Sequence, residues 1–247
     1  RKEMVTLVVT EGPGSMDLFS QRLSRYLKVP TFHTDIYQRS CEQFSTPLIS
    51  MKSFKLVLTD INFIRKLRKL HDVIHLPNHH LGRFGNFLEK PFIITVHDLI
   101  RYFDTKRSDP YIHKPNLRDR ILLKLDVEGI KKAEIVVTPS HHSKKDVIEH
   151  LKLPERKVVT IYHGVDEIFR PKKKKETNPY ILYVGSMHPR KNLKTLIEAF
   201  RLLKMDGRFR DLKLVMVGRP GGQERDFRNE TLSLIQEKGL SNEIILK

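Results

Sequence analysis

The feature that most constrains the fold is an alternation of short apolar segments with longer amphipathic ones. The short segments are apolar at nearly every position and cover residues 5–10, 73–76, 92–96, 134–138, 158–162, 180–184, 212–217 and 243–246. Such strands are buried on both faces, as in a parallel sheet between helices. Helical spacing covers residues 15–27, 62–71, 117–132, 140–150, 192–203 and 225–238, whereas residues 31–58 have no clear pattern. The sequence therefore predicts an α/β fold with open, doubly wound parallel sheets.

A basic segment interrupts this alternation. Pro171 is followed by four lysines, Lys172–Lys175, and the segment ends at Pro179. A run of this composition favours a solvated linker over a packed core. We therefore expect an N-terminal domain over residues 1–170, a linker over 171–179 and a second domain from residue 180 to 247. A domain of this kind needs roughly 150–200 residues, so we expect only part of the second one in this chain.

Charge and cysteine content narrow the partners and the compartment. The chain of 247 residues carries a formal net charge of +17, which predicts an anionic partner: nucleic acid, a phosphorylated small molecule or an anionic lipid surface. There is no Trp and no recognisable nucleic-acid-binding motif, which disfavours nucleic acid. Cys41 is the only cysteine and fits a reducing compartment. With no signal-peptide pattern at its start, we expect a cytoplasmic protein, either with its basic residues in solvent or attached peripherally to an anionic membrane.

Ligands of open α/β sheets bind at the carboxyl ends of the strands, so the loops that follow the strands are the candidate sites. The first such loop contains Gly12 and Gly14 before a helix, which allows a ligand to approach the backbone. Because Asp17 stands where a dinucleotide fingerprint has its third glycine, a plain tight turn is an equal alternative.

Histidines follow the next two strands. His79 and His80 come after residues 73–76, and His97 with Asp98 comes after residues 92–96. The adjacent pair is poorly spaced for one metal ion, so we expect no metal site. A polar or acid–base role is the better interpretation for His97, whereas His79 and His80 fit a buried structural role equally well.

A further strand-end loop combines glycine with paired cations. Gly185 and Ser186 follow residues 180–184, and Arg190 and Lys191 come just before the next helix. Backbone N–H groups and the helix dipole attract phosphate, and the two cations add charge-assisted hydrogen bonds. Cations at a helix N-terminus oppose its dipole, which favours a bound anion between them. The arrangement predicts a diphosphate site.

Four segments in this order resemble the retaining glycosyltransferases of family 4, which have the GT-B fold. They are TVHDL at 95–99, VVTPS at 136–140 with SKKD at 143–146, HGVD at 163–166, and YVGS at 183–186 with PRKN at 189–192. The resemblance implies two Rossmann-like domains, with a nucleoside-diphosphate sugar bound mainly by the second. It also implies transfer of a hexose, for which we expect mannose from GDP-mannose, to a glycan or lipid-linked acceptor, without a cofactor or metal.

The resemblance also assigns roles to residues. Arg190 and Lys191, with Gly185 and Ser186, would hold the donor diphosphate. His97 would lie beside the anomeric centre, and the 12–14 loop would lie near the acceptor and phosphates. The transfer would pass through an oxocarbenium-like transition state with front-face attack by the acceptor.

Two departures from the family pattern keep other functions open. Many members have Arg at the position of Ser186, and the later Glu-x7-Glu motif does not occur before Lys247. A sugar-nucleotide epimerase of the same architecture, a non-catalytic glycosyltransferase-like binding protein and a nucleic-acid-binding module are the alternatives. The residues do not identify the donor base, the acceptor or the linkage.

Overall fold

The computed structural model describes residues 4–36, 50–108, 114–171, 179–218 and 224–247. The chain divides into two compact units, Arg1–Gly164 and Val165–Lys247. This division lies within the HGVD motif, a few residues before the expected linker. Residues 172–178 of that linker lie outside the described residues.

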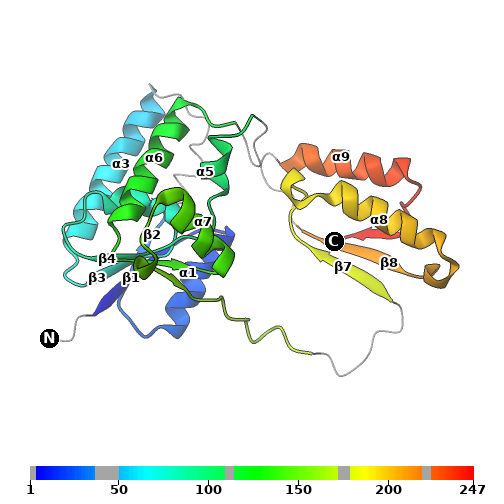
Figure 1. The fold of residues 1–247 in the computed structure, drawn as a ribbon, viewed down its shortest axis with the longest axis horizontal. Helices are drawn as coiled ribbons and strands as arrows, with labels where there is room; N and C mark the ends of the chain where they lie inside the picture. The colour runs from blue at the N-terminus through cyan, green and yellow to red at the C-terminus, as the bar shows by residue number, and fades with distance from the viewer. Residues whose placement is uncertain (1–3, 37–49, 109–113, 172–178, 219–223) are drawn as a thin grey trace. The chain divides into compact units, whose positions relative to one another are not determined.

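The first unit is built on a six-stranded parallel sheet (Figure 1). Its strands are β1 (Val5–Thr10), β2 (Thr31–Thr34), β3 (Val73–Leu76), β4 (Phe92–Thr95), β5 (Ile135–Thr138) and β6 (Val158–Thr160). Their order in the sheet is β2-β1-β3-β4-β5-β6. The order reverses between β1 and β3, and an open sheet forms its ligand crevice at such a switch point, beyond the carboxyl ends of the strands.

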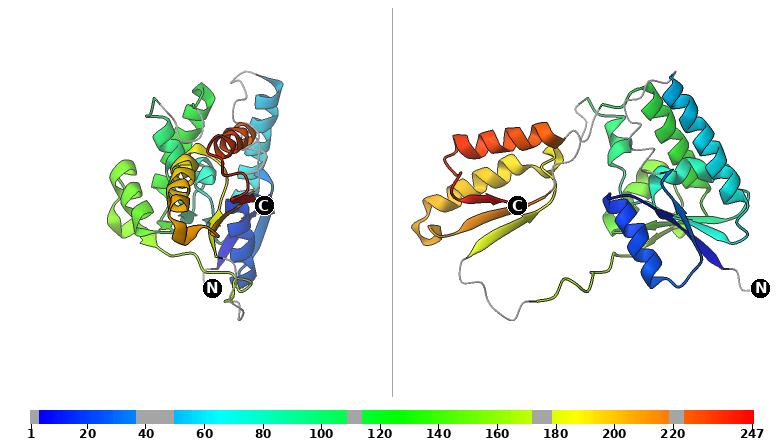
Figure 2. Two further views of the ribbon diagram at one scale, coloured as in Figure 1. Left: turned by 90° about the vertical axis from the view of Figure 1, so that its right-hand side faces the viewer. Right: turned by 180° about the vertical axis from the view of Figure 1, so that it is seen from behind.

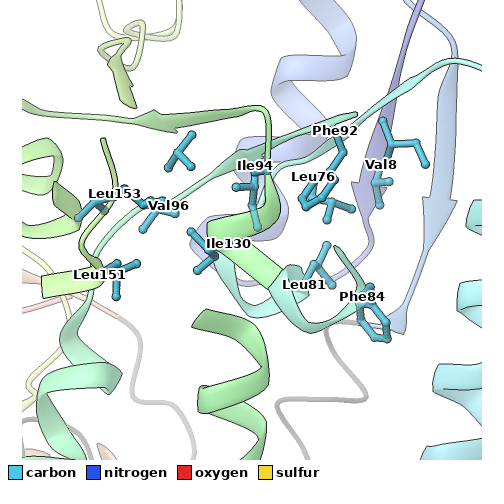
Figure 3. Close-up of a cluster of buried hydrophobic side chains, with 14 of the residues drawn as sticks. Val8, Leu76, Leu81, Phe84, Phe92, Ile94, Val96, Ile130, Leu151 and Leu153 are labelled. Carbon is cyan, nitrogen blue, oxygen red and sulfur yellow. The ribbon is translucent and has the colours of Figure 1, made fainter. Parts of the chain in front are cut away.

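Helices cover this sheet and complete its core. They are α1 (Ser15–Tyr26), α3 (Met51–Arg68), α4 (Gly82–Gly85), α5 (Ile100–Asp104), α6 (Leu117–Lys132) and α7 (His141–Leu151). Strand residues such as Leu76 and Ile94 pack with Phe84 of α4 and Ile130 of α6 in one buried cluster (Figure 3). Burial of such side chains is the main force that holds helices on a sheet.

Two glycines set the contact between α4 and α6. A Cβ atom on Gly129 would lie 1.7 Å from the backbone oxygen of Gly82, and one on Gly82 would lie 2.4 Å from the backbone oxygen of Asp126. The two backbones therefore touch with no space for a methyl group on either residue. This contact supports the segment just before α4, which belongs to the candidate site described below.

We expect the substitution Gly129→Ala to destabilise the first unit strongly. The new methyl group would overlap a backbone oxygen that cannot move alone, so the helices must separate, which lowers the free energy of unfolding by about 3 kcal/mol. Urea unfolding followed by circular dichroism measures the change. Gly164→Ala is the control, since among the described residues only its chain neighbours lie within 4 Å of its Cβ position. Equal stabilities of the two variants would contradict this packing.

The second unit has a three-stranded parallel sheet of order β7-β8-β9. Its elements are β7 (Tyr180–Val184), α8 (Leu193–Met205), β8 (Lys213–Val217), α9 (Glu224–Glu237) and β9 (Ile244–Leu246). Both helices lie on the same side of this sheet (Figures 1 and 2). Ile197 and Phe200 of α8 pack with Leu214 and Met216 of β8 to form the core.

All of the predicted strands and helices are present, whereas strand β2, helices α4 and α5 and the first part of α3 were not predicted. β2, an edge strand of sequence TFHT, was not predicted, because its polar residues carry no apolar signal. Helix α3 begins at Met51 rather than at residue 62. Its first turns carry apolar side chains on the solvent side, which hides the amphipathic period from the sequence.

The prediction that every strand is buried on both faces is wrong for β7. Ile181 and Tyr183 pack into the core, whereas Tyr180, Leu182 and Val184 on the other face are exposed. The reason is the placement of α8 and α9 on one face of the sheet. The described parts of the chain place no helix of this unit on the other face.

Candidate functional site

The carboxyl edge of the first sheet gathers residues from four strand ends. The loop after β1 carries Gly12 and Gly14, the short helical segment after β3 carries His79 and His80, His97 follows β4, and His163 follows β6. The parallel pairing of the strands brings these segments to one edge. The sequence-predicted histidines therefore lie together at the switch point.

His97 is held by hydrogen bonds from three directions. Its Nε2 atom lies 2.9 Å from the backbone oxygen of Pro77, its backbone N–H donates to His79 Nδ1 at 3.3 Å, and its backbone oxygen accepts a bond from Ser143 Oγ at 3.1 Å. A carbonyl oxygen only accepts, so Nε2 carries the proton and Nδ1 is the acceptor in the neutral ring. The ring is thus fixed in both position and tautomer.

Burial keeps the histidines of this edge neutral. It lowers the pKa of His97, against the smaller opposing effects of the Pro77 carbonyl bond and the Asp98 charge. Burial also lowers the pKa of His79 to about 4, and that of His80 well below its usual value. Near neutral pH, His97 therefore offers a hydrogen-bond acceptor rather than a positive charge.

Phe19 of α1 closes one side of the histidine cluster. Its ring stacks on His163 with centroids 4.7 Å apart and meets the edge of His97 at 4.9 Å. The His97 and His163 rings are themselves 5.5 Å apart. Ring contacts of this kind restrict the rotamers of the histidine rings. Phe19 is not predictable as a site residue from the sequence, since one Phe within an amphipathic helix carries no signal of its own.

The 12–14 loop packs on the carboxylate of Asp17. Gly14 N donates to Asp17 Oδ2 at 3.2 Å, and a Cβ atom on Gly12 would lie 2.5 Å from the same oxygen. Asp17 is 3% exposed, and its Oδ1 has no hydrogen-bond partner among the described residues. This glycine loop therefore depends on a negative charge at the start of α1, where a phosphate would be repelled.

A buried ion network supports the histidine segment from behind. Arg83 of α4 donates from Nη1 to the backbone oxygen of His80 at 2.7 Å, and the same atom lies 3.4 Å from Asp126 Oδ1. Arg83 Nε also lies 3.6 Å from Asp60 Oδ2 of α3. Burial raises the pKa of Asp126 to about 7, although the charge and N–H groups of Arg83 oppose the shift. Helices α3, α4 and α6 thereby fix the backbone that carries His79.

The second unit presents the predicted diphosphate loop at the carboxyl edge of its own sheet. Strand β7 ends at Val184, and Gly185 N donates to the backbone oxygen of Val217 at 2.9 Å. Tyr183 Oη donates to the backbone oxygen of Ser186 at 2.6 Å. These bonds fix the loop between the strand and the start of α8 and leave Ser186 partly exposed.

Gly218 was not singled out from the sequence and is part of this loop. A Cβ atom on Gly218 would lie 2.0 Å from the backbone oxygen of Gly185, so the ends of β7 and β8 approach each other closely. This contact exists only in the folded sheet. The sequence signal that could have located it is a glycine directly after an apolar strand next to the β7 strand.

Arg190 and Lys191 lie at the N-terminal end of α8. They form the short helical turn Pro189–Lys191, and Lys191 N donates to the backbone oxygen of His188 at 2.8 Å. Both side chains are exposed, and neither forms an ion pair with another residue of the described ranges. Two exposed cations at the positive end of a 13-residue helix are an arrangement that can attract an anion.

The candidate site residues therefore lie in two groups, one on each unit. His97, Gly12 and Gly14 share the edge of the first sheet, and Gly185, Ser186, Arg190 and Lys191 share the edge of the second. In the described ranges, no three His, Cys, Asp or Glu side chains are arranged to hold a metal ion. Cys41 lies outside those ranges.

Comparisons with known proteins match both units. The profile described as Glycosyltransferase Family 4 matches residues 6–168, and the one described as Glycosyl transferases group 1 matches residues 164–247. The chain is 29% identical over 170 residues to O-antigen chain mannosyltransferase B of Escherichia coli. That match covers 64% of this chain and 42% of the relative, so the chain spans less than half of the length of that protein.

Solved structures agree on the fold. HepE of Anabaena, in complex with UDP and glucose, has a TM-score of 0.67 at 14% identity, covering 99% of this chain and 68% of that one. Sucrose-phosphate synthase from Thermosynechococcus elongatus has a TM-score of 0.69 at 16% identity, covering 100% and 70%. The expected GT-B fold with parallel sheets is thereby confirmed. The first profile alone matches well over half of the sequence, and the chain belongs to glycosyltransferase family 4.

Proposed function

We propose that the protein is a retaining hexosyltransferase that moves a sugar from a nucleoside-diphosphate donor to a glycan or lipid-linked acceptor. The observation that carries the proposal is the pair of exposed cations, Arg190 and Lys191, at the start of α8 beside the Gly185 loop. During transfer the departing nucleoside diphosphate gains negative charge. Preorganised cations and a helix N-terminus stabilise such charge without reorganisation.

His97 would contact the transferred sugar as a neutral hydrogen-bond acceptor. Its proton is on Nε2, toward the Pro77 oxygen, so Nδ1 accepts a bond from a sugar hydroxyl. The lowered pKa argues against a general acid role near neutral pH. A positioned neutral ring orients the sugar beside the developing oxocarbenium ion, consistent with a reaction that needs no protein nucleophile.

The 12–14 loop fits the acceptor better than the donor phosphates. The Asp17 carboxylate beneath Gly12 and Gly14 repels phosphate, whereas a carboxylate beside a loop is suited to acceptor hydroxyls. Family resemblance placed the loop near both the acceptor and the phosphates, and we keep only the acceptor role. Diphosphate binding is then left to the second unit, at Arg190 and Lys191.

GDP-mannose is the donor that we propose. The support is the 29% identity to a mannosyltransferase, the O-antigen chain mannosyltransferase B of Escherichia coli. The HepE and sucrose-phosphate synthase structures support the fold and leave the sugar open. We also propose that the protein acts in the cytoplasm, whose reducing conditions fit a sequence with a single cysteine.

Titration calorimetry on the full-length protein tests this proposal. We expect GDP-mannose and GDP to bind at one site, and we expect added salt to weaken both, because charge pairs contribute to the affinity. UDP-glucose is the comparison ligand. Tighter binding of UDP-glucose than of GDP-mannose would identify a uridine nucleotide sugar as the donor and contradict the assignment of GDP-mannose. Failure of every nucleoside diphosphate to bind would contradict the proposed activity.

A further inference from the structure

Helix α3 carries an apolar stripe on its solvent side. Met51, Phe54, Val57, Leu58 and Ile61 are all between 39% and 74% exposed. The spacing of Met51, Phe54, Leu58 and Ile61 by three or four residues places them along one side of the helix. The side chains that α3 buries, Ser53, Phe63 and Leu67, lie on the other side. We call the five exposed residues the α3 stripe.

Positive charge borders the α3 stripe. Lys52 and Lys55 are exposed beside its first turns, and exposed Arg65, Lys66 and Arg68 follow in the last turns. Arg68 is ion-paired with Glu89. The one acidic residue in the helix, Asp60, faces Arg83 instead. The outward side of α3 therefore combines apolar side chains with net positive charge.

Helix α6 adds a second apolar stripe beside it. Leu117, Ile121 and Leu125 are spaced by four residues and are 40% to 64% exposed. The two helices lie side by side (Figures 1 and 2), and Arg83 contacts Asp60 of α3 and Asp126 of α6. Scattered apolar residues are normal on a surface, but stripes on neighbouring helices mark an interaction surface.

The N-terminal ends of α3 and α6, where both stripes begin, point toward the carboxyl ends of the strands. Strand β2 ends at Thr34 and α3 then begins at Met51, so the N-terminal half of α3 lies toward the carboxyl ends of the strands. Helix α6 leads into the start of β5, so its N-terminal half, with Leu117, also lies toward that edge.

We propose that the outward faces of α3 and α6 bind the surface of an anionic lipid bilayer. An apolar stripe bordered by lysines and arginines is the pattern of a helix that lies in the plane of the membrane interface, with its cations at the anionic head groups. No helix of the described ranges is long and apolar enough to cross a bilayer, so the contact is with the membrane surface. The inference bears on the lipid-linked acceptor of the proposed function, but binding itself needs no catalysis.

Co-sedimentation of the full-length protein with vesicles tests this inference. We expect binding to vesicles of phosphatidylglycerol and phosphatidylcholine at low salt, and weaker binding to phosphatidylcholine alone or at high salt. Phe54→Ser with Leu58→Ser should lower the partition coefficient at least about tenfold, because two apolar side chains no longer enter the interface. Lys52→Glu with Lys55→Glu should weaken binding through charge alone.

Leu202→Ser with Met205→Ser is the matched control, since these residues are equally exposed on α8 of the second unit. It should leave vesicle binding unchanged. The inference is overturned if the wild-type protein stays in the supernatant or if the α8 control binds as weakly as the α3 variant. It is also overturned if, without vesicles, sedimentation velocity shows a dimer that the α3 variant abolishes. GDP-mannose binding retained by the α3 variant separates this test from that of the proposed function.

Discussion

Replacing Arg190 and Lys191 together by alanine should lower kcat/KM for sugar transfer by about 10³-fold, equivalent to about 4 kcal/mol. Both cations are exposed at the start of α8, beside a loop fixed by the Gly185–Val217 hydrogen bond. A charge-assisted hydrogen bond to phosphate contributes about 1.5–3 kcal/mol, so loss of two removes most of the charge stabilisation. Steady-state kinetics with the proposed donor measure the loss.

The control for this variant removes the same charge at the other end of α8. Arg208 and Arg210 are exposed and follow the C-terminus of the helix. Arg208→Ala with Arg210→Ala should leave kcat/KM near the wild-type value, because neither residue lies at the helix N-terminus. If kcat/KM fell by a similar factor in both double variants, the effect would come from the overall charge of the protein. Near wild-type activity without Arg190 and Lys191 would show that the diphosphate is bound elsewhere.

His97→Ala should lower kcat by about 100-fold and leave the affinity for free nucleoside diphosphate unchanged. The ring is fixed by the hydrogen bond to Pro77 and by the T-shaped contact with Phe19, so its removal would take away the preorganised contact that we propose with the sugar. The loop that we propose to bind the diphosphate belongs to the second unit and does not contain this residue. Kinetics and calorimetry on the same preparation separate the two effects.

The matched control for His97 is His75→Ala on the neighbouring strand β3. Burial lowers the pKa of His75 to about 4, and its Nε2 lies 2.9 Å from Thr95 Oγ1. It lies within the strand rather than at the carboxyl edge, so its loss should reduce stability and leave kcat near the wild-type value. Equal losses of kcat in the two variants would assign His97 a structural role only.

The parallel sheets could be predicted because each buried strand is a short run of consecutive apolar residues. β1, β3 and β7 have the predicted bounds, since apolar runs flanked by turn residues are local signals. The start of α3 was missed for a different reason. Phe54 and Leu58 are apolar but face solvent, and a period analysis assumes that apolar residues face the core.

Part of the candidate site could be predicted, namely the residues whose type and place after a strand already indicate their chemistry. His97 and the Arg190-Lys191 pair lie in the segments that connect a strand to the next helix, so the rule that ligands bind at strand ends locates them. Asp17, Phe19 and Gly218 were not predicted as site residues, because their roles come from contacts that arise on folding. Asp17 lies under Gly12, Phe19 stacks on His163, and Gly218 approaches Gly185. For Asp17 and Phe19 no residue pattern along the chain encodes the approach, whereas Gly218 has a local signal because it directly follows an apolar strand.

The central claim is sugar transfer from a nucleoside-diphosphate donor with retention, and proton NMR of the reaction tests it most directly. The full-length protein is incubated with GDP-mannose and candidate acceptors, and the anomeric signals are followed. The predicted result is release of GDP together with a new glycoside that has the anomeric configuration of the donor. An epimerised sugar or sugar nucleotide, or a donor that stays intact with every acceptor, would contradict the claim.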